Sequence, residues 1–270
     1  MLYRESATDP DPPVSEAAWI EGRPGLRLRY GDGAEYHVSA DAHEVWVTWP
    51  GALAFEDAMI HLVGPVLGFI LRRRGVLSLH ASGAVIGGRA AAFSGESGAG
   101  KSTIAAALAA AGHAALADDV LALREVRGTM MAYPAYDHLR VWDDAARALV
   151  GEEHELPWLT PSWDKRAFTL ETLGYPVARA PAPLGWIFLL ADRTNDEASP
   201  RVEPVRAADA FVPLVANTSA NYLLSPEMRA EEFALLARLL ERTPVLRLFP
   251  HTDPARLSQL VSCVLEAVSA

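Results

Sequence analysis

The chain has 270 residues, of which 50% are hydrophobic and 21% are charged, and its formal net charge is −10. This size and composition suit one large domain, or one domain with a small lobe, and exclude a fibre or a disordered chain. The negative charge argues against nucleic acid and anionic membranes as partners.

Cysteine usage and hydropathy predict a cytoplasmic protein. Cys263 is the only cysteine, which excludes an internal disulfide and suits a reducing compartment. The most apolar window, residues 58–70, is too short to span a bilayer. Residues 1–13 lack the apolar core of a signal peptide. We therefore expect no membrane association, and the sequence leaves a homo-oligomer open.

Residues 1–75 are expected to form a small β-rich lobe that ends in one helix. After a proline-rich lead-in, apolar and polar residues alternate as in half-buried strands, at 26–30, 36–40 and 45–49. A helix is predicted over about 54–72, because three arginines suit its last turn and a glycine follows them. A contact between these arginines and an anion is the alternative.

Residues 76–270 are expected to form the larger domain. It begins with a β-hairpin over 76–94, which turns at a Gly-Gly pair. Further strands are predicted at 114–118, 129–133, 185–192 and 244–249. Helices are predicted at 101–111, 207–216, 226–241 and 254–269. Strands and helices that alternate, with a hairpin among them, predict an α/β class (mixed α+β) with a mixed sheet.

A phosphate-binding loop lies between the hairpin and the first of these helices. The residues Gly-Glu-Ser-Gly-Ala-Gly-Lys-Ser, at 95–102, fit the pattern G-x-x-x-x-G-K-[ST], with an apolar strand before them and a helix-forming run after them. The glycines let several backbone N–H groups point at one anion, and the helix dipole adds to their effect. Lys101 is expected to reach the β- and γ-phosphates, and the Ser102 hydroxyl to bind Mg²⁺. The expected ligands are ATP and Mg²⁺, and the expected nucleotide-binding residues are Gly95, Glu96, Ser97, Gly98, Ala99, Gly100, Lys101, Ser102 and Thr103.

Two aspartates, Asp118 and Asp119, follow Lys101 by only 17 and 18 residues. The intervening helix carries the chain about 16 Å away from the phosphates, and the strand over 114–118 brings it back by about the same distance. A right-handed crossover lays this strand parallel to 90–94, with its carboxyl end beside the loop. We therefore expect one carboxylate to bind Mg²⁺ and the other to accept a proton from an attacking hydroxyl.

The assignment of the two roles is open on the sequence. Successive strand residues point to opposite faces, so one aspartate is expected to face the phosphates and the other the far side or the strand end. Asp119 is named with Ser102 as a metal ligand, and Asp118 and Asp119 are both named as catalytic candidates. A solvated turn after a short strand is the alternative.

These residues resemble the catalytic domain of HPr kinase/phosphorylase and its shorter bacterial relatives. The likeness lies in "SGESGAGKST" followed closely by "GHAALADDV", and in His80 of "LSLHASG", 21 residues before Lys101. The resemblance implies an ATP-dependent kinase for a serine hydroxyl, with the PEP-carboxykinase-like variant of the P-loop fold. It also implies that one aspartate is the general base and that His80 lies near the phosphates or assists proton handling.

The chain departs from HPr kinase in two respects. Only about 75 residues precede the part that carries the likeness. The downstream Glu-Ile-Arg-Gly-type segment, which supplies a metal carboxylate in that family, is replaced by "YPAYDHLRVWDD" at 133–144. Asp137 or Asp143 would then take its place.

A second resemblance concerns the acceptor. "PSWDKR", at 161–166, is similar to the shorter kinases found with lasso-peptide gene clusters, which phosphorylate the C-terminal serine of a precursor peptide. Under that resemblance Lys165 and Arg166 are candidate contacts for a phosphate or for the carboxylate of the peptide. Asp137 is also named among the candidate substrate-binding residues.

The first function hypothesis is therefore a Mg·ATP-dependent serine kinase whose partner is a peptide or protein that carries the acceptor serine, in the first place a lasso-type precursor. The alternatives are an HPr-type protein serine kinase, a kinase for a small hydroxylated metabolite, and a nucleotide-binding regulatory module without phosphoryl transfer. Such a module needs the loop but no base, so the aspartate pair argues against it.

Overall fold

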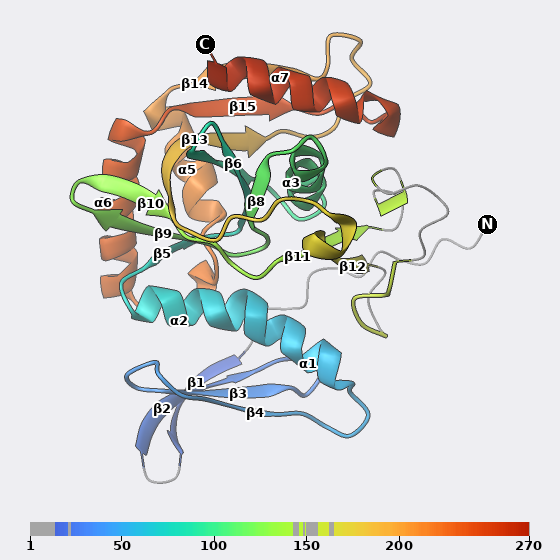
Figure 1. Ribbon diagram of the computed structural model, residues 1–270. Coiled ribbons are helices and arrows are strands. Elements are labelled where there is room, and N and C mark those ends of the chain that lie inside the picture. The colour runs from blue at the N-terminus through green and yellow to red at the C-terminus, as the bar shows by residue number, and fades with distance from the viewer. Residues whose placement is uncertain are drawn as a thin grey trace.

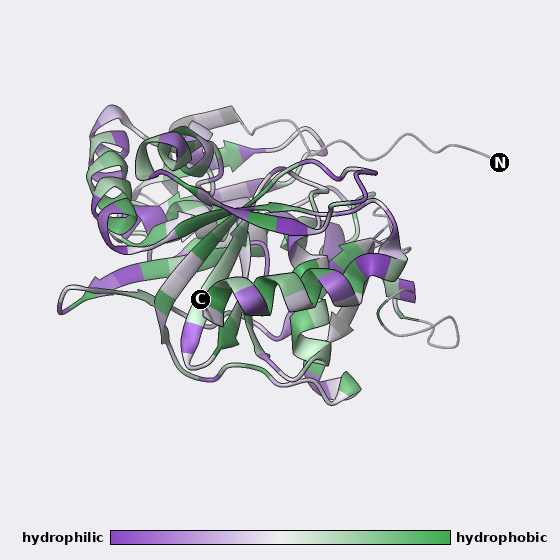
Figure 2. Ribbon diagram, turned by 90° about the horizontal axis from the view of Figure 1, so that it is seen from above, coloured by the Kyte–Doolittle hydropathy of each residue, from purple (hydrophilic) through white to green (hydrophobic). Residues whose placement is uncertain are grey.

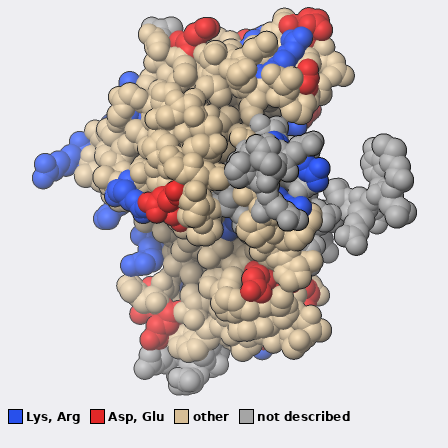
Figure 3. All heavy atoms as spheres, turned by 45° about the vertical axis from the view of Figure 1, so that its right-hand side comes forward, with Lys and Arg blue, Asp and Glu red and all other residues tan. Residues whose placement is uncertain are grey.

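The computed structural model describes residues 14–20, 23–142, 146–147, 149, 156–161 and 165–269. A small antiparallel sheet lies at one end, a larger mixed sheet carries helices on both faces, and a helical segment lies between the two (Figure 1). No helix in these ranges is both long and apolar enough to cross a bilayer. On the face seen in Figure 3, acidic and basic side chains are interspersed among uncharged ones.

The small sheet has the order β1-β2-β3-β4, and each pair of neighbours is antiparallel. Its strands are β1 (Val14–Ile20), β2 (Arg23–Arg29), β3 (Glu35–Ser39) and β4 (Val45–Thr48). The three strands predicted in this region are confirmed. The sequence does not predict β1, because "VSEAAWI" lacks the alternation of apolar and polar residues that marks a half-buried strand.

One face of the small sheet packs on the helical segment. Leu28 and Tyr36 of the sheet form a buried cluster with Val66 and Phe69 of the helices. The Tyr36 hydroxyl donates a hydrogen bond to the backbone carbonyl oxygen of Ala58 at 2.5 Å, which satisfies a polar group inside this cluster. Burial of this apolar surface is what holds the small sheet against the helices.

The helix predicted over 54–72 is present but broken. It consists of α1 (Phe55–His61), the π-helical turn η1 (Leu62–Val66) and α2 (Leu67–Arg73). At Gly64 the backbone leaves helical geometry, with φ −101° and ψ −108°. The cause is Pro65, which has no N–H to donate and crowds the residue before it.

The larger sheet has the order β5-β9-β10-β13-β7-β6-β8, and β15 pairs with β13 and β14. Its strands are β5 (Leu77–Leu79), β6 (Ala81–Ile86), β7 (Arg89–Ser94), β8 (Ala114–Ala117), β9 (Leu121–Val126), β10 (Thr129–Ala132), β13 (Ala182–Leu190), β14 (Arg201–Val205) and β15 (Val245–Phe249). Strand β13 runs parallel to β7 and to β15, whereas the hairpin pairs are antiparallel. The predicted α/β class with a mixed sheet is confirmed.

The predicted parallel direction of the strand after the phosphate loop relative to β7 is confirmed, but the two strands are not neighbours. The strand after the phosphate loop, β8, does not pair with β7, because β6 lies between them and is antiparallel to both. Strand β6 directly precedes β7 in the chain and pairs with it in a hairpin, so β6 occupies the position beside β7. Since both are antiparallel to β6, β8 and β7 still point the same way, and the carboxyl end of β8 reaches the loop as expected.

The two ends of this strand path meet where the site lies. The chain passes from β5, at one end, to β6, near the other end, through the single residue His80. It passes back from β8, at the far end, to β9, beside β5, through residues 118–120. Both connections run between the same two ends of the sheet. Because the sheet curls, these ends lie close together and His80 lies beside Asp118 and Asp119.

Helices cover both faces of the larger sheet. Helices α3 (Lys101–Ala110) and α7 (Leu257–Ser269) pack on one face, and α5 (Ala207–Ala216) and α6 (Pro226–Arg242) pack on the other. Figure 2 shows the central strands between them as largely hydrophobic. The predicted helices are confirmed, and the side chain of Ser225 caps α6 by accepting a hydrogen bond from the backbone N–H of Met228.

The close packing of helix α3 explains its alanine-rich sequence. It packs against the sheet, against α7, and against the hairpin of β11 (His138–Trp142) and β12 (Lys165–Thr169). Most of its residues are buried, and small side chains let these neighbours approach closely. Three short 3₁₀ turns complete the described elements: η2 (Leu170–Leu173), η3 (Asn221–Leu223) and η4 (Pro254–Arg256).

Candidate active site

The phosphate loop joins β7 to α3 and is shaped by its glycines. Gly98 and Gly100 have φ values of +81° and +104°, which side-chain-bearing residues rarely adopt. Gly100 is the N-cap of α3 and offers no side chain to the first N–H groups of the helix, which lack intrahelical partners. The Lys101 ammonium lies across the loop and donates to the carbonyl oxygens of Gly95 and Glu96, at 2.8 and 2.9 Å. Free backbone N–H groups at a helix N-terminus, with a lysine beside them, can hold an anion such as a phosphate.

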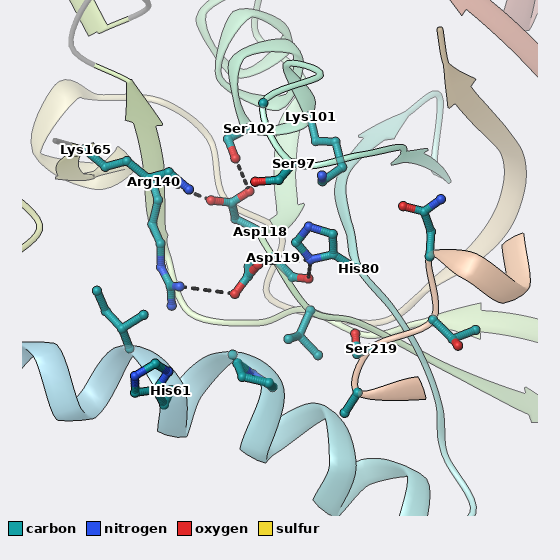
Figure 4. Close-up of a pocket in the computed structure, with 18 of the residues that line it drawn as sticks. His61, His80, Ser97, Lys101, Ser102, Asp118, Asp119, Arg140, Lys165 and Ser219 are labelled. Carbon is teal, nitrogen blue, oxygen red and sulfur yellow. Dashed lines mark hydrogen bonds and ion pairs between the residues drawn. The ribbon is translucent and has the colours of Figure 1, made fainter. Parts of the chain in front are cut away.

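Asp118 is buried at the end of β8 and is held by three hydrogen bonds. Its Oδ1 accepts from the hydroxyl of Ser82 at 2.6 Å. The same oxygen accepts from the hydroxyl of Ser102 at 2.7 Å, and Oδ2 accepts from the backbone N–H of Arg140 at 2.9 Å (Figure 4). Its exposed fraction is 1%. This carboxylate therefore faces the start of α3 and shares its position with the predicted metal-binding hydroxyl of Ser102.

The side chain of Asp119 has other partners than that of Asp118. Its φ of +69° places it in the left-handed region, which aspartate tolerates better than most residues. Its Oδ1 lies 3.1 Å from His80 Nδ1, and its Oδ2 lies 3.1 Å from Arg140 Nη1. The left-handed turn takes Asp119 off the line of the strand, so both carboxylates line one cavity instead of facing opposite sides of the sheet.

The charge state of Asp119 follows from its neighbours. Burial raises its pKa, but the hydrogen bond and charge of His80, with the charges of Arg140 and Lys165, outweigh burial and hold the pKa well below its usual range. For Arg140, burial lowers the pKa, but the Asp119 charge raises it above its ordinary value. Asp119 is consequently an ionised carboxylate over the whole physiological range.

Arg140 is the residue that holds both aspartates. Its backbone N–H binds Asp118, while its guanidinium binds Asp119 (Figure 4). The guanidinium also donates to the Tyr136 hydroxyl at 2.5 Å. The sequence does not single out this arginine. The available signal is its place on the strand "HLRVW", which closes over α3.

The two aspartates open into a cavity of about 350 Å³. The phosphate loop and the strand ends form its floor, the α1–η1 segment of the first lobe forms one wall, and the segment over 216–222 forms another (Figure 4). The lining from the first lobe includes Tyr30, Ile60, His61, Gly64 and Pro65. The lobe is therefore part of the site and not a separate appendage.

The segment over 216–222 forms a wall of the cavity, although the sequence predicts only a connecting loop over 217–227. All seven of its residues line the cavity, from Ala216 to Tyr222. The backbone N–H of His80 donates to the carbonyl oxygen of Asn217, and the backbone N–H of Ser219 donates to the carbonyl oxygen of Ser78. These two bonds tie the segment to the crossing at His80. A pattern of Asn, Thr, Ser and Ala has no helical or strand period, so nothing local marks it as a wall.

The other predicted site residues fall into two groups. The cavity is lined by these residues of the predicted set: His80, Ser97, Gly98, Gly100, Lys101, Ser102, Thr103, Asp118, Asp119 and Lys165. Arg166 lies apart, with its guanidinium 3.4 Å from the centre of the Trp158 ring and bound to the carbonyl oxygen of Leu156. Asp137 also lies outside this lining and pairs with His138 at 3.0 Å.

The four remaining predicted site residues do not line the described cavity or fall outside the described residues. Gly95, Glu96 and Ala99 belong to the phosphate loop but not to the lining of this cavity. Asp143 lies outside the described residues.

The donors at Asp118 and Ser102 fit Mg²⁺. The two oxygens are 2.7 Å apart, and both are hard ligands of the kind that this ion prefers. In kinase sites Mg²⁺ is commonly held by one or two carboxylates together with phosphate oxygens and water. Among the described residues, no group of three or more His, Cys, Asp or Glu side chains forms a metal site by itself. The geometry joins Ser102 to Asp118, whereas the predicted pair was Ser102 and Asp119.

No protein-family model and no curated protein sequence matches this chain. Among solved structures, the chain is similar to the Hpr(Ser) kinase/phosphatase from Coxiella burnetii, with 14% sequence identity and a TM-score of 0.37. That match covers 70% of this chain and 88% of the other one. At this level of similarity membership of the family is not shown, and the function of the chain rests on the residues of its own cavity.

Proposed function

We propose that this protein is a Mg·ATP-dependent kinase that transfers the γ-phosphoryl group to the hydroxyl of a serine. The observation that carries the proposal is the division of labour between the two carboxylates. Asp118 is bonded to the Ser102 hydroxyl of the phosphate loop, while Asp119 projects from the next residue into the same cavity. A module that only binds nucleotide needs the first carboxylate but not the second.

The proposed reaction is an in-line displacement. The acceptor oxygen forms a bond to the γ-phosphorus, the bond from that phosphorus to the β–γ bridging oxygen breaks, and ADP leaves. The proton of the hydroxyl passes to the Asp119 carboxylate. The neighbours of Asp119 lower its pKa. The negative charge of a bound nucleotide raises the pKa of a nearby carboxylate and therefore offsets part of this lowering.

The remaining residues position these groups. Lys101 and the loop N–H groups bind phosphate oxygens, and Arg140 and His80 hold Asp119 in its orientation. Ser102 and Asp118 would hold Mg²⁺, which neutralises charge on the β- and γ-phosphates when it is bound. The sequence leaves both aspartates as base candidates and names Asp119 with Ser102 as a metal ligand, whereas this assignment gives the metal to Asp118 and the proton to Asp119.

A peptide is the acceptor that we propose, in the first place a lasso-type precursor with a C-terminal serine. Support comes from the cavity wall over 216–222, which offers backbone and small polar side chains, and from Lys165, which lines the cavity where a carboxylate would be attracted. An HPr-type protein or a small hydroxylated metabolite would use the same transfer chemistry. The acceptor assay separates these cases.

Incubation with Mg·ATP and a precursor peptide that ends in serine is expected to add about 80 Da to the peptide, as one phosphoryl group does. Fragmentation in the mass spectrometer should place the added mass on the terminal serine, and a Ser→Ala peptide should stay unmodified. Release of ADP only with small hydroxylated compounds would instead favour a metabolite kinase. ATP binding without turnover on any acceptor class would contradict the kinase proposal.

Gly64→Ala is expected to lower the transfer rate by about 10- to 100-fold, because misplacement by a fraction of an ångström is costly in an aligned site. An added Cβ would lie 3.0 Å from Asp119 Oδ2, which is closer than an ordinary contact. The expected loss in the free energy of unfolding is only about 1 kcal/mol. Gly51→Ala, where a Cβ meets nothing within 4 Å, is the matched control. Steady-state kinetics and urea unfolding give both quantities, and an unchanged rate would show that the α1–η1 wall does not constrain Asp119.

A further inference from the structure

We propose that the base of the nucleotide binds in a second cleft, on the flank of the phosphate loop that lies away from the two aspartates. This inference rests on the proposed function and extends it, because it assigns the nucleoside half of the substrate. The cleft is small, at about 60 Å³, and open to solvent on one side. Its apolar lining includes Ile104, Pro250, Leu257 and Leu260, and its polar lining includes Arg193 and His251.

The phosphate loop connects the two hollows. Gly100 and Thr103 line both the large cavity and the second cleft, so a chain of phosphates on the loop leads from one to the other. In an in-line transfer the acceptor and the leaving ADP lie on opposite sides of the γ-phosphorus. Asp119, the proposed general base, lies on the side of the γ-phosphorus where the acceptor hydroxyl binds. The nucleoside therefore leaves the loop on the other side, where the second cleft lies.

The polar residues of the cleft are held in place by backbone pairing. The backbone N–H of Thr194 donates to the carbonyl oxygen of Pro250, and the backbone N–H of Thr252 donates to the carbonyl oxygen of Thr194, both at 3.0 Å. These bonds join the segment that carries Arg193 to the segment that carries His251. A preorganised wall of this kind lowers the entropic cost of binding a planar ligand.

His251 supplies a donor that lacks a partner in the described part of the chain. Its Nδ1 accepts a hydrogen bond from the backbone N–H of Asp253 at 2.9 Å, so the proton of the neutral ring is on Nε2. That Nε2 is buried and has no hydrogen-bond partner among the described residues. A buried donor without a partner costs free energy. The adenine ring of ATP in this cleft, with acceptor ring nitrogens at its edge, provides the acceptor.

Arg193 lies where the cleft meets the loop. A Cβ placed on Gly100 would be 3.2 Å from Arg193 Nη2, so the guanidinium rests directly against the loop backbone. A planar guanidinium can stack on an aromatic base or bind a phosphate oxygen. The apolar side chains of Leu257 and Leu260 offer the opposing surface for a flat ring.

The first test compares ATP with inorganic tripolyphosphate, which carries the phosphates without the base. His251→Ala is expected to weaken ATP binding about tenfold, the effect of one lost hydrogen bond with its packing. Tripolyphosphate affinity should change by less than about twofold, because the loop is intact. His113→Ala, which removes an imidazole just beyond the other end of α3, should change neither affinity. Calorimetry gives both constants, and equal losses for the two ligands, or no loss for ATP, would overturn the inference.

The second test uses the unaltered protein. Photolysis with 8-azido-ATP should label a peptide from the segment 250–260, whereas label on 60–65 or 216–222 would place the base in the large cavity and overturn the inference. This outcome is separable from that of the kinase assay. Label on 250–260 without transfer to any acceptor would leave the base site standing and remove the kinase proposal. Transfer with label elsewhere would do the reverse.

Discussion

Asp119→Asn is expected to reduce phosphoryl transfer by about 10²- to 10⁴-fold, the contribution of a positioned general base. The amide keeps the shape of the side chain but cannot take the proton of the acceptor hydroxyl. ATP binding should remain within about threefold of the original, because phosphate affinity comes from the loop and Lys101. Single-turnover transfer assays and calorimetric titration with ATP measure the two quantities.

Two further substitutions sharpen this test. Asp118→Asn should also lower transfer, but part of the loss should be recovered at high Mg²⁺, because this carboxylate is bonded to the Ser102 hydroxyl. The loss in Asp119→Asn should not respond to Mg²⁺. Asp137→Asn, which alters an aspartate outside the cavity, is the control. If Asp119→Asn transfers at the original rate, Asp119 is not the base. If it responds to Mg²⁺ as Asp118→Asn does, the two roles are assigned the wrong way round.

Arg72→Met is expected to destabilise the protein by about 3–5 kcal/mol, because it leaves a buried carboxylate without its cation. Arg72 Nε lies 3.2 Å from Glu232 Oε2, and the two side chains are 1% and 4% exposed. Burial raises the pKa of Glu232 and lowers the pKa of Arg72 in spite of their mutual attraction. Urea unfolding followed by tryptophan fluorescence measures the change.

The double variant with Glu232→Leu separates a lost charge pair from lost packing. With both charges removed, the stability should return to within about 2 kcal/mol of the original, since desolvation offsets most of the attraction in a buried pair. Arg74→Met, on the exposed neighbouring position, should change stability by less than about 0.5 kcal/mol. A double variant as unstable as Arg72→Met alone would show that the arginine acts through packing.

This buried pair also links the fold to the site. Arg72 lies in the last turn of α2, which follows the α1–η1 wall of the cavity. Glu232 accepts a hydrogen bond at 3.1 Å from Thr218, which lines the cavity. The pair therefore joins the first lobe to the segment over 216–222. Loss of ATP-dependent transfer at temperatures below the unfolding midpoint of Arg72→Met is the expected functional consequence.

Local signals in the sequence were sufficient for much of the fold. The phosphate loop was found because its glycines and Lys101 act within eight residues and need no distant partner. The helices over 207–216 and 226–242 were found because their apolar period is local, and the cap at Ser225 has a local signature. The sequence predicts the helix broken at Gly64 as one continuous helix, because the signals for its end, the arginines and the glycine after them, lie beyond the break.

The position of the carboxylates was predicted in part. Helix and strand lengths explain why the chain returns to the loop, and β8 does point the same way as β7. The lengths of the helix and the strand do not predict that β6 lies between β7 and β8. Nor do they show that a left-handed residue at 119 turns the second carboxylate into the same cavity as the first.

What the sequence by itself determined is the presence of a nucleotide site and of two carboxylates at its edge, because the loop and the strand behind it are contiguous in the chain. The tertiary structure alone decided how those carboxylates divide their work. Arg140, the α1–η1 wall and the segment over 216–222 come from distant parts of the chain. They meet only because the curled sheet brings its two ends close together at His80 and residues 118–120. Contacts of that kind depend on the sum of all strand pairings, which no local pattern of residues contains.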